Sequence, residues 1–204
     1  KVIASHANTN PGLAMFSAEI HSERVGHPLV LDDLILSDCR SDAKSLGAYY
    51  TDEVVAHFLV RWAVRSESDT ILDPSAGGGV FLDAAVRRLR DLGRRGSLGV
   101  YGVEIDTDTH AAIAARLTAE LGAGKPRLTC ADFFSVMPGD LPPMTAVVGN
   151  PPFIRYQRFA GADRDRALRR TAAQGVDLPK LASSWAPFVI HSTAFLSPGG
   201  RLAM

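Results

Sequence analysis

Four consecutive residues near position 150 combine an amide, two prolines and an aromatic ring: Asn150, Pro151, Pro152 and Phe153. They follow an apolar run, residues 145–149, which predicts a buried strand. Neither proline has an N–H to donate, so the predicted strand must end at this point. The resulting turn offers a side-chain carbonyl, a rigid backbone carbonyl and a flat ring. Together these groups are suited to holding a planar amine.

A glycine-rich turn lies upstream, between a predicted strand and a predicted helix. Residues 70–73 form the short strand, which ends in Asp73, and residues 74–79 read Pro-Ser-Ala-Gly-Gly-Gly. Apolar residues then recur at helical spacing over residues 80–94. Strand, glycine turn and helix form the first unit of a doubly wound sheet, and glycines let the backbone approach a ligand closely. Alone, this turn is weak evidence for a nucleotide-like ligand.

Two further strands are predicted to end in acidic residues. Residues 98–103 lead into Glu104, and a helix with Ile113 and Leu117 facing inward follows and stops at Gly122. An acid at this strand end either faces solvent or accepts hydrogen bonds from ribose hydroxyls, and the glycine turn favours the second interpretation. Residues 127–134 form a third strand that ends in Asp132 and Phe133, a carboxylate and a ring that suit a purine. All these strand ends should meet at the carboxyl edge of the sheet.

The remaining segments are less specific. Residues 1–45 predict an N-terminal arm or a small helical segment, and Thr51 is a plausible N-cap for a helix over residues 54–64. One face of that helix carries apolar residues, as in an amphipathic helix: Val55, Phe58, Leu59 and Trp62. A last helix is predicted over residues 185–196, followed by a turn at 197–200 and a fifth strand from 201.

Arginines cluster just after the Asn-Pro-Pro-Phe turn. They are Arg155, Arg158, Arg164, Arg166, Arg169 and Arg170. From charge alone a solvated helix is the simpler interpretation, while a loop that contacts phosphates is the alternative.

Composition excludes several function classes. The 204 residues carry 22 basic and 22 acidic side chains, so no global field attracts nucleic acid or membrane. The six histidines and two cysteines show no metal-ligand spacing, and free thiols in a reducing compartment are expected. Neither a signal peptide nor a membrane-spanning run is predicted. The chain starts at Lys1 and stops at Met204 inside an apolar run, so a fragment is expected.

The motifs in this order resemble those of the amino-group DNA methyltransferases that make N6-methyladenine. The resemblance covers residues 46–204 and follows the arrangement of type II-G restriction-modification enzymes, in which the cofactor motifs precede the catalytic one. It implies an α/β, Rossmann-like, doubly wound and mostly parallel sheet, truncated before its last strands. Residues 46–204 would be an incomplete catalytic domain without a target-recognition domain. Asp52 departs from the family, which usually has proline after the threonine.

The resemblance also implies roles for individual residues, with S-adenosylmethionine as cofactor and no metal. Residues around its methionine part would be Thr51, Asp73, Ala76, Gly77 and Gly79. Glu104 would hold the ribose hydroxyls, Ile105 and Phe133 would pack on the cofactor's adenine, and Asp132 would accept from its amino group. The catalytic residues would be Asn150, Pro151, Pro152 and Phe153.

The implied function is methyl transfer to the N6 amine of a flipped-out adenine in DNA, in the cytoplasm and within a restriction-modification system. Arg155, Arg158, Arg164 and Arg166 are candidate DNA contacts. The alternatives are an N-methyltransferase acting on RNA or a protein glutamine, and a non-catalytic module with a methyltransferase fold. A dehydrogenase is disfavoured because the glycine turn lacks the G-x-G-x-x-G spacing.

Overall fold

The computed structural model describes residues 51–204 except 122–123, 155–158 and 180. All of them belong to the second of the two units into which the chain divides, Cys39–Met204. The predicted arm, its boundary after residue 45, and Gly122, Arg155 and Arg158 lie outside the described residues. In the part of the chain that is described, no helix is long and apolar enough to cross a membrane.

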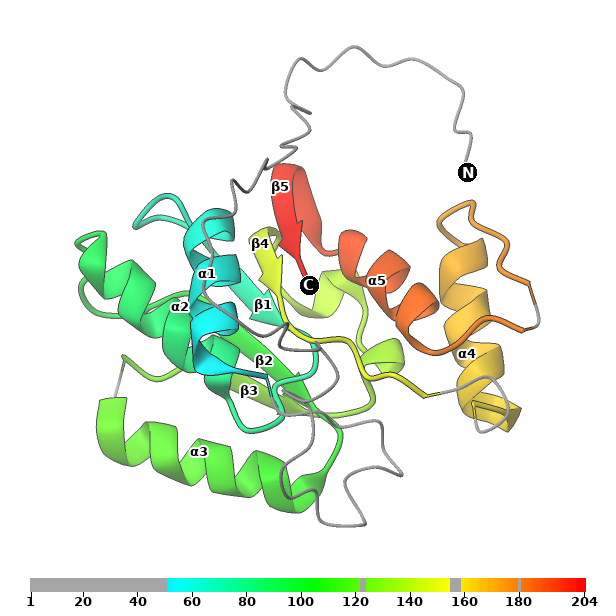
Figure 1. The fold of residues 1–204 in the computed structure, drawn as a ribbon, viewed down its shortest axis with the longest axis horizontal. Coiled ribbons are helices and arrows are strands. Elements are labelled where there is room, and N and C mark those ends of the chain that lie inside the picture. The colour runs from blue at the N-terminus through cyan, green and yellow to red at the C-terminus, as the bar shows by residue number, and fades with distance from the viewer. Residues whose placement is uncertain (1–50, 122–123, 155–158, 180) are drawn as a thin grey trace, which may run out of the picture. The chain divides into compact units, whose positions relative to one another are not determined.

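Five parallel strands form one sheet in the order β3-β2-β1-β4-β5 (Figure 1). Their bounds are β1 Ile71–Asp73, β2 Val100–Glu104, β3 Arg127–Cys130, β4 Met144–Val148 and β5 Leu196–Ala203. The chain moves outward from β1 to β3 and then returns to place β4 on the other side of β1. The topological switch point therefore lies between the ends of β1 and β4, and the predicted doubly wound α/β fold is confirmed.

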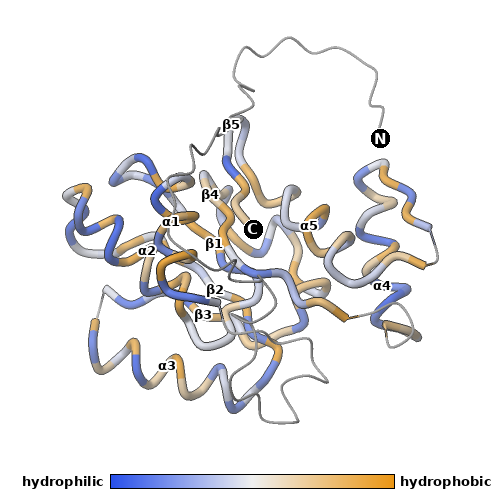
Figure 2. Tube along the Cα trace, in the orientation of Figure 1, coloured by the Kyte–Doolittle hydropathy of each residue, from blue (hydrophilic) through white to orange (hydrophobic). Residues whose placement is uncertain are grey.

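Helices cover both faces of this sheet, and each face has its own apolar core. The first face carries α1 Glu53–Ala63, α2 Val80–Asp91 and α3 Thr107–Leu121, and the second carries α4 Gly161–Ala172 and α5 Trp185–Thr193. Adjacent strand residues alternate between the faces, since Ile71 packs in the first core and Leu72 in the second. In Figure 2 the helices alternate between hydrophilic and hydrophobic stretches, as expected for elements with one face on the sheet.

The sequence predicts an inward apolar face on a helix over residues 80–94; α2 has this face but ends at Asp91. Leu82, Val86 and Leu89 are buried, while Arg87 and Arg90 are exposed. Complete burial of one leucine side chain stabilises a fold by about 1.5–3 kcal/mol. Leu82 and Leu89 therefore explain why α2 lies on the sheet directly behind the glycine turn.

The first helix differs from its prediction in two ways. Asp52, not Thr51, is the N-cap, because its side chain accepts hydrogen bonds from the N–H groups of Val54 and Val55 at 2.8 and 3.4 Å. The predicted apolar face is also not the buried one, since Phe58 is 70% exposed. The buried residues of α1 are Ala56, Val60 and Ala63. With these side chains in the first core, α1 packs against α2 and approaches β4 and β5.

The C-terminal boundaries also differ from their predictions. Helix α5 ends at Thr193, and the residues predicted as a turn, 197–200, lie within β5. The pairing of β4 with β5 shifts register there, so these residues form an irregularity inside the strand. At the other edge, β3 ends at Cys130, and Phe133–Ser135 form a short 3₁₀ helix, η3.

Candidate active site

Asp73 ends β1 and is completely buried at the switch point. Its Oδ1 accepts a hydrogen bond from the Ser75 N–H at 3.1 Å, while no described residue provides a partner for Oδ2. Burial raises the pKa of Asp73 to about 7, and the charge of Glu104 adds to the rise although the Ser75 hydrogen bond opposes it. A buried carboxylate with an open acceptor is suited to a cationic ligand group.

The glycine turn after Asp73 is shaped by hydrogen bonds from both ends. Its Ala76 N–H donates to the Val103 carbonyl at 2.8 Å, which ties the turn to β2. Gly79 has a φ of 86°, a value that favours glycine, and it is the N-cap of α2. A Cβ there would lie 2.8 Å from a nitrogen of Arg116, which also donates to the Gly78 carbonyl at 3.3 Å. Arg116 from α3 therefore closes one side of the turn.

Glu104 joins the turn to the end of β2. Its Oε2 accepts from the Gly77 N–H at 2.8 Å and its Oε1 from the Asp106 N–H at 2.9 Å. The carboxylate thus lies across the glycines, where a ligand on the turn would meet it. The next side chain, Ile105, is 57% exposed and offers an apolar surface at the same edge.

Asp132 caps η3, and its two oxygens have different partners. Oδ1 accepts from the Phe134 N–H at 3.0 Å, and Oδ2 forms an ion pair with Arg166 of α4. Its neighbour Phe133 is only 3% exposed and packs among Phe188, His191 and Phe195. The Phe133 ring thus lies in the second core beneath the edge, which does not favour its predicted contact with a cofactor.

The Asn-Pro-Pro-Phe turn follows β4 beside the glycine turn. Ser75 Oγ donates to the Asn150 carbonyl at 3.0 Å, a hydrogen bond that connects the two turns directly. The side chain of Asn150 is exposed, and Phe153 is 44% exposed. Gly149 precedes them, and a Cβ at this position would lie 2.9 Å from Asp73 Oδ1. The turn therefore presents its amide and its ring at the same edge as Asp73.

Hydrogen bonds or close approach thus bring together Asp73, the glycine turn, Glu104 and the Asn150 turn. Thr51 is half-buried before α1, and no hydrogen bond among the described residues joins it to this group. Of the predicted DNA contacts, Arg166 pairs instead with Asp132 and Asp163, and Arg164 lies half-buried on α4. The described residues contain no cluster of metal-ligating side chains.

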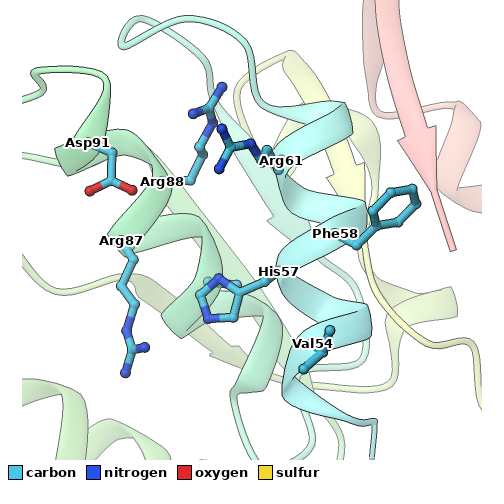
Figure 3. A pocket seen from close by; sticks show the side chains of 8 residues that line it. Val54, His57, Phe58, Arg61, Arg87, Arg88 and Asp91 are labelled. Carbon is cyan, nitrogen blue, oxygen red and sulfur yellow. The ribbon is translucent and has the colours of Figure 1, made fainter.

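A separate cavity of about 260 Å³ lies between α1 and α2 (Figure 3). Its lining residues are Val54, His57, Phe58, Arg61, Ala84, Arg87, Arg88 and Asp91. None of the residues at the strand ends lines this cavity, so it is not the site that the sequence predicts.

The parallel sheet, with a glycine turn and an Asn-Pro-Pro-Phe turn at its switch point, defines a Rossmann-like fold of the methyltransferase class. Residues 32–204 match the family model described as N-6 DNA Methylase, and the chain belongs to this family.

Two type II methyltransferases are similar to this chain and agree with the family assignment. The type II methyltransferase M.BstVI of Geobacillus stearothermophilus is 29% identical over 78% of this chain, which covers 33% of that protein. M.XamI of Xanthomonas campestris pv. amaranthicola is 30% identical over 77% of this chain, which covers 29% of it. The chain thus spans about a third of the length of these relatives.

Solved structures share the fold. The methyltransferase subunit of a type I restriction-modification system from Streptococcus thermophilus has a TM-score of 0.58 and 22% identity. The match covers 75% of this chain and 33% of that subunit.

Three contacts at this edge are absent from the sequence prediction. Ser75 lies within the glycine motif, so the sequence predicts its position in the turn but not its hydrogen bond to Asn150. Arg166 is predicted from the sequence as part of the arginine cluster, but its ion pair with Asp132 is not. Ser184, which contacts the Asn-Pro-Pro-Phe turn from the start of α5, carries no local sequence signal at all.

Proposed function

We propose that this chain carries the catalytic centre of an S-adenosylmethionine-dependent methyltransferase that methylates the N6 amine of adenine in DNA, within a restriction-modification system. The observation that carries the proposal is the hydrogen bond from Ser75 to the Asn150 carbonyl. It joins a glycine turn with ligand-binding features to a turn able to hold an amine, at the ends of the adjacent strands β1 and β4. A methyl donor bound at the glycine turn and an amine bound at the Asn-Pro-Pro-Phe turn would therefore be neighbours.

The residues at the strand ends fit S-adenosylmethionine. Asp73 is buried, and none of the described residues pairs with its Oδ2, which suits the ammonium group of the cofactor's methionine part. Ala76, Gly77 and Gly79 would surround this methionine part, and Glu104 would accept from ribose hydroxyls. Ile105 would pack on the adenine of the cofactor, and Asp132 would accept from its amino group, with Phe133 supporting η3 from the core. Thr51 is proposed as a further contact from family resemblance alone.

The chain's own residues would act by positioning the target amine. When bound, the cofactor supplies an electrophilic methyl on a sulfonium. Asn150 Oδ1 and the Pro151 carbonyl would each accept one N–H of the amine, which directs the nitrogen lone pair at that methyl. Once the nitrogen had accepted the methyl group, the amine would lose one proton to solvent. Phe153 would stack on the base, which must leave the duplex to reach the turn.

The test is methyl transfer from tritiated cofactor to duplex DNA, RNA or protein, using the full open reading frame that contains these residues. Label in the adenine of DNA, lost in Asn150→Ala, supports the proposal. Label only in RNA or in a protein glutamine would replace DNA as the substrate. Absence of both transfer and cofactor binding by calorimetry would favour a non-catalytic module.

Arginines that follow the Asn-Pro-Pro-Phe turn are proposed to contact the DNA duplex. Arg164 on α4 and the preceding arginines, Arg155 and Arg158, follow the Asn-Pro-Pro-Phe turn in sequence and would contact phosphates. Arg166 would be a DNA contact only if its ion pair with Asp132 opened. A methyltransferase acting on cellular DNA would work in the cytoplasm, and this location is part of the proposal.

A further inference from the structure

Ser184 stands at the N-cap position of α5, but its side chain does not cap that helix. A serine at this position ordinarily accepts a hydrogen bond from an N–H in the first helical turn. Here the hydroxyl turns away and contacts the Asn-Pro-Pro-Phe turn, across 32 positions of sequence. The residue is 2% exposed, so this arrangement is shielded from competing water.

The hydroxyl of Ser184 uses both of its hydrogen-bonding functions on the turn. It donates to the Pro152 carbonyl at 2.5 Å and accepts from the Ile154 N–H at 2.7 Å. The Ser184 N–H also donates to the Ile154 carbonyl at 3.1 Å. The backbone is therefore held on both sides of Phe153, whose ring is 44% exposed.

The carbonyls of the turn have different partners. That of Asn150 accepts from Ser75 Oγ, and that of Pro152 accepts from Ser184 Oγ. Among the residues that the structure describes, none donates to the carbonyl between them, on Pro151. The two serines thus hold the flanking peptide groups and donate nothing to the carbonyl that the proposed reaction requires.

We propose that Ser184 is a positioning residue for methyl transfer, which fixes the Pro151 carbonyl and the Phe153 ring toward the target base. This inference rests on the proposed function for its catalytic consequence. Ser184 touches neither base nor cofactor in this role, so its loss should act on turnover through the geometry of the turn. A misplacement of about 1 Å in such a site can cost roughly 10²-fold in rate.

The test compares Ser184→Ala with Ser192→Ala in the full open reading frame. Ser192 is a matched control because it is also buried on α5, but its Oγ donates only to the Phe188 carbonyl of the same helix, at 2.8 Å. Ser184→Ala should lower kcat for DNA methylation by about 10- to 100-fold with the cofactor Kd within about twofold of wild type. Ser192→Ala should leave kcat within about threefold of wild type. Equal losses of kcat in the two variants would overturn the proposal, because the effect would then follow stability alone.

A second readout does not depend on activity. Hydrogen exchange of the Ile154 amide should be about five- to tenfold faster in Ser184→Ala and unchanged in Ser192→Ala. If wild type transfers no methyl group, the proposed function fails while faster exchange at Ile154 still establishes the hold on the turn. Unchanged exchange at Ile154 would overturn the positioning role whatever the activity.

Discussion

Replacing Asp73 by asparagine should change the pH dependence of folding stability. The folded-state pKa of Asp73 is raised from 3.8 to about 7 by burial. Its contribution to stability is therefore fully present below pH 3.8 and is lost as the pH rises through about 7. One pKa unit corresponds to about 1.36 kcal/mol. Ionisation of Asp73 in the unfolded chain therefore lowers the free energy of unfolding of the wild type by about 4 kcal/mol at pH 8 but only about 1.5 kcal/mol at pH 5.

Asparagine removes this pH-dependent term. Its Oδ1 can still accept from the Ser75 N–H, while its NH₂ would occupy the position of Oδ2, where the described residues offer no partner. An unsatisfied buried group costs about 1–3 kcal/mol, but this cost does not vary with pH. The stability of Asp73→Asn relative to wild type should thus increase by about 2.5 kcal/mol from pH 5 to pH 8.

Urea unfolding of the cofactor-free protein at the two pH values measures this difference. Asp69→Asn, at the other end of β1, is the matched control. Burial tends to raise the pKa of Asp69, but hydrogen bonds from Ser66, Arg65 and Thr145 and the charge of Arg201 outweigh it, so that pKa is lowered. Its stabilisation is complete above pH 3.8 and is lost only as the pH falls further. Asp69→Asn should therefore destabilise equally at pH 5 and pH 8. If the free energy of unfolding of Asp73→Asn relative to wild type stayed constant or fell from pH 5 to pH 8, the assignment of a raised pKa would be refuted.

Three further substitutions test the site. Asn150→Ala should lower kcat by about 10²–10³-fold and leave the cofactor Kd unchanged by calorimetry, because the side chain is exposed and would act on the amine; a weakened Kd with normal kcat would contradict this role. Glu104→Gln has one acceptor oxygen for two backbone N–H groups, so thermal unfolding should show a loss of about 1–3 kcal/mol, together with weaker cofactor binding; full retention of both would remove Glu104 from the site. Gly149→Ala should cost about 1–3 kcal/mol because its Cβ would lie 2.9 Å from Asp73 Oδ1. Gly139→Ala, with no atom within 4 Å of its Cβ, is the control, and equal losses in the two would show that the close approach is unimportant.

The positions of the strand ends could be predicted from the sequence because the signals are local. A short apolar run followed by glycines or prolines marks where a strand stops, and parallel strands must stop at one edge. This logic predicted the positions of Asp73, Glu104 and Asn150. It also predicted the inward face of α2, where leucine and valine recur at helical spacing.

The sequence does not predict burial and contacts where they depend on packing between elements far apart in the chain. On α1 the sequence favours the larger residues as the buried face, but the residues buried against α2, β4 and β5 are Ala56, Val60 and Ala63. Phe133 follows a predicted strand like a ligand contact, and its ring packs on Phe188 of α5, so its contact with a cofactor stays a prediction. The hold of Ser184 on Pro152 joins residues 32 apart, a distance at which a lone serine gives no signal.

The close approach of Gly149 to Asp73 has an evolutionary consequence. Because residue 149 carries no side chain, the end of β4 approaches the Asp73 carboxyl directly, and the backbones of the two strand ends keep the spacing of neighbouring strands, about 4.7–4.9 Å. Substitutions elsewhere can remodel loops and helices without altering this separation. In the proposed methyltransferase, exchange of the parts that choose a target sequence would leave the spacing of these two strand ends unchanged.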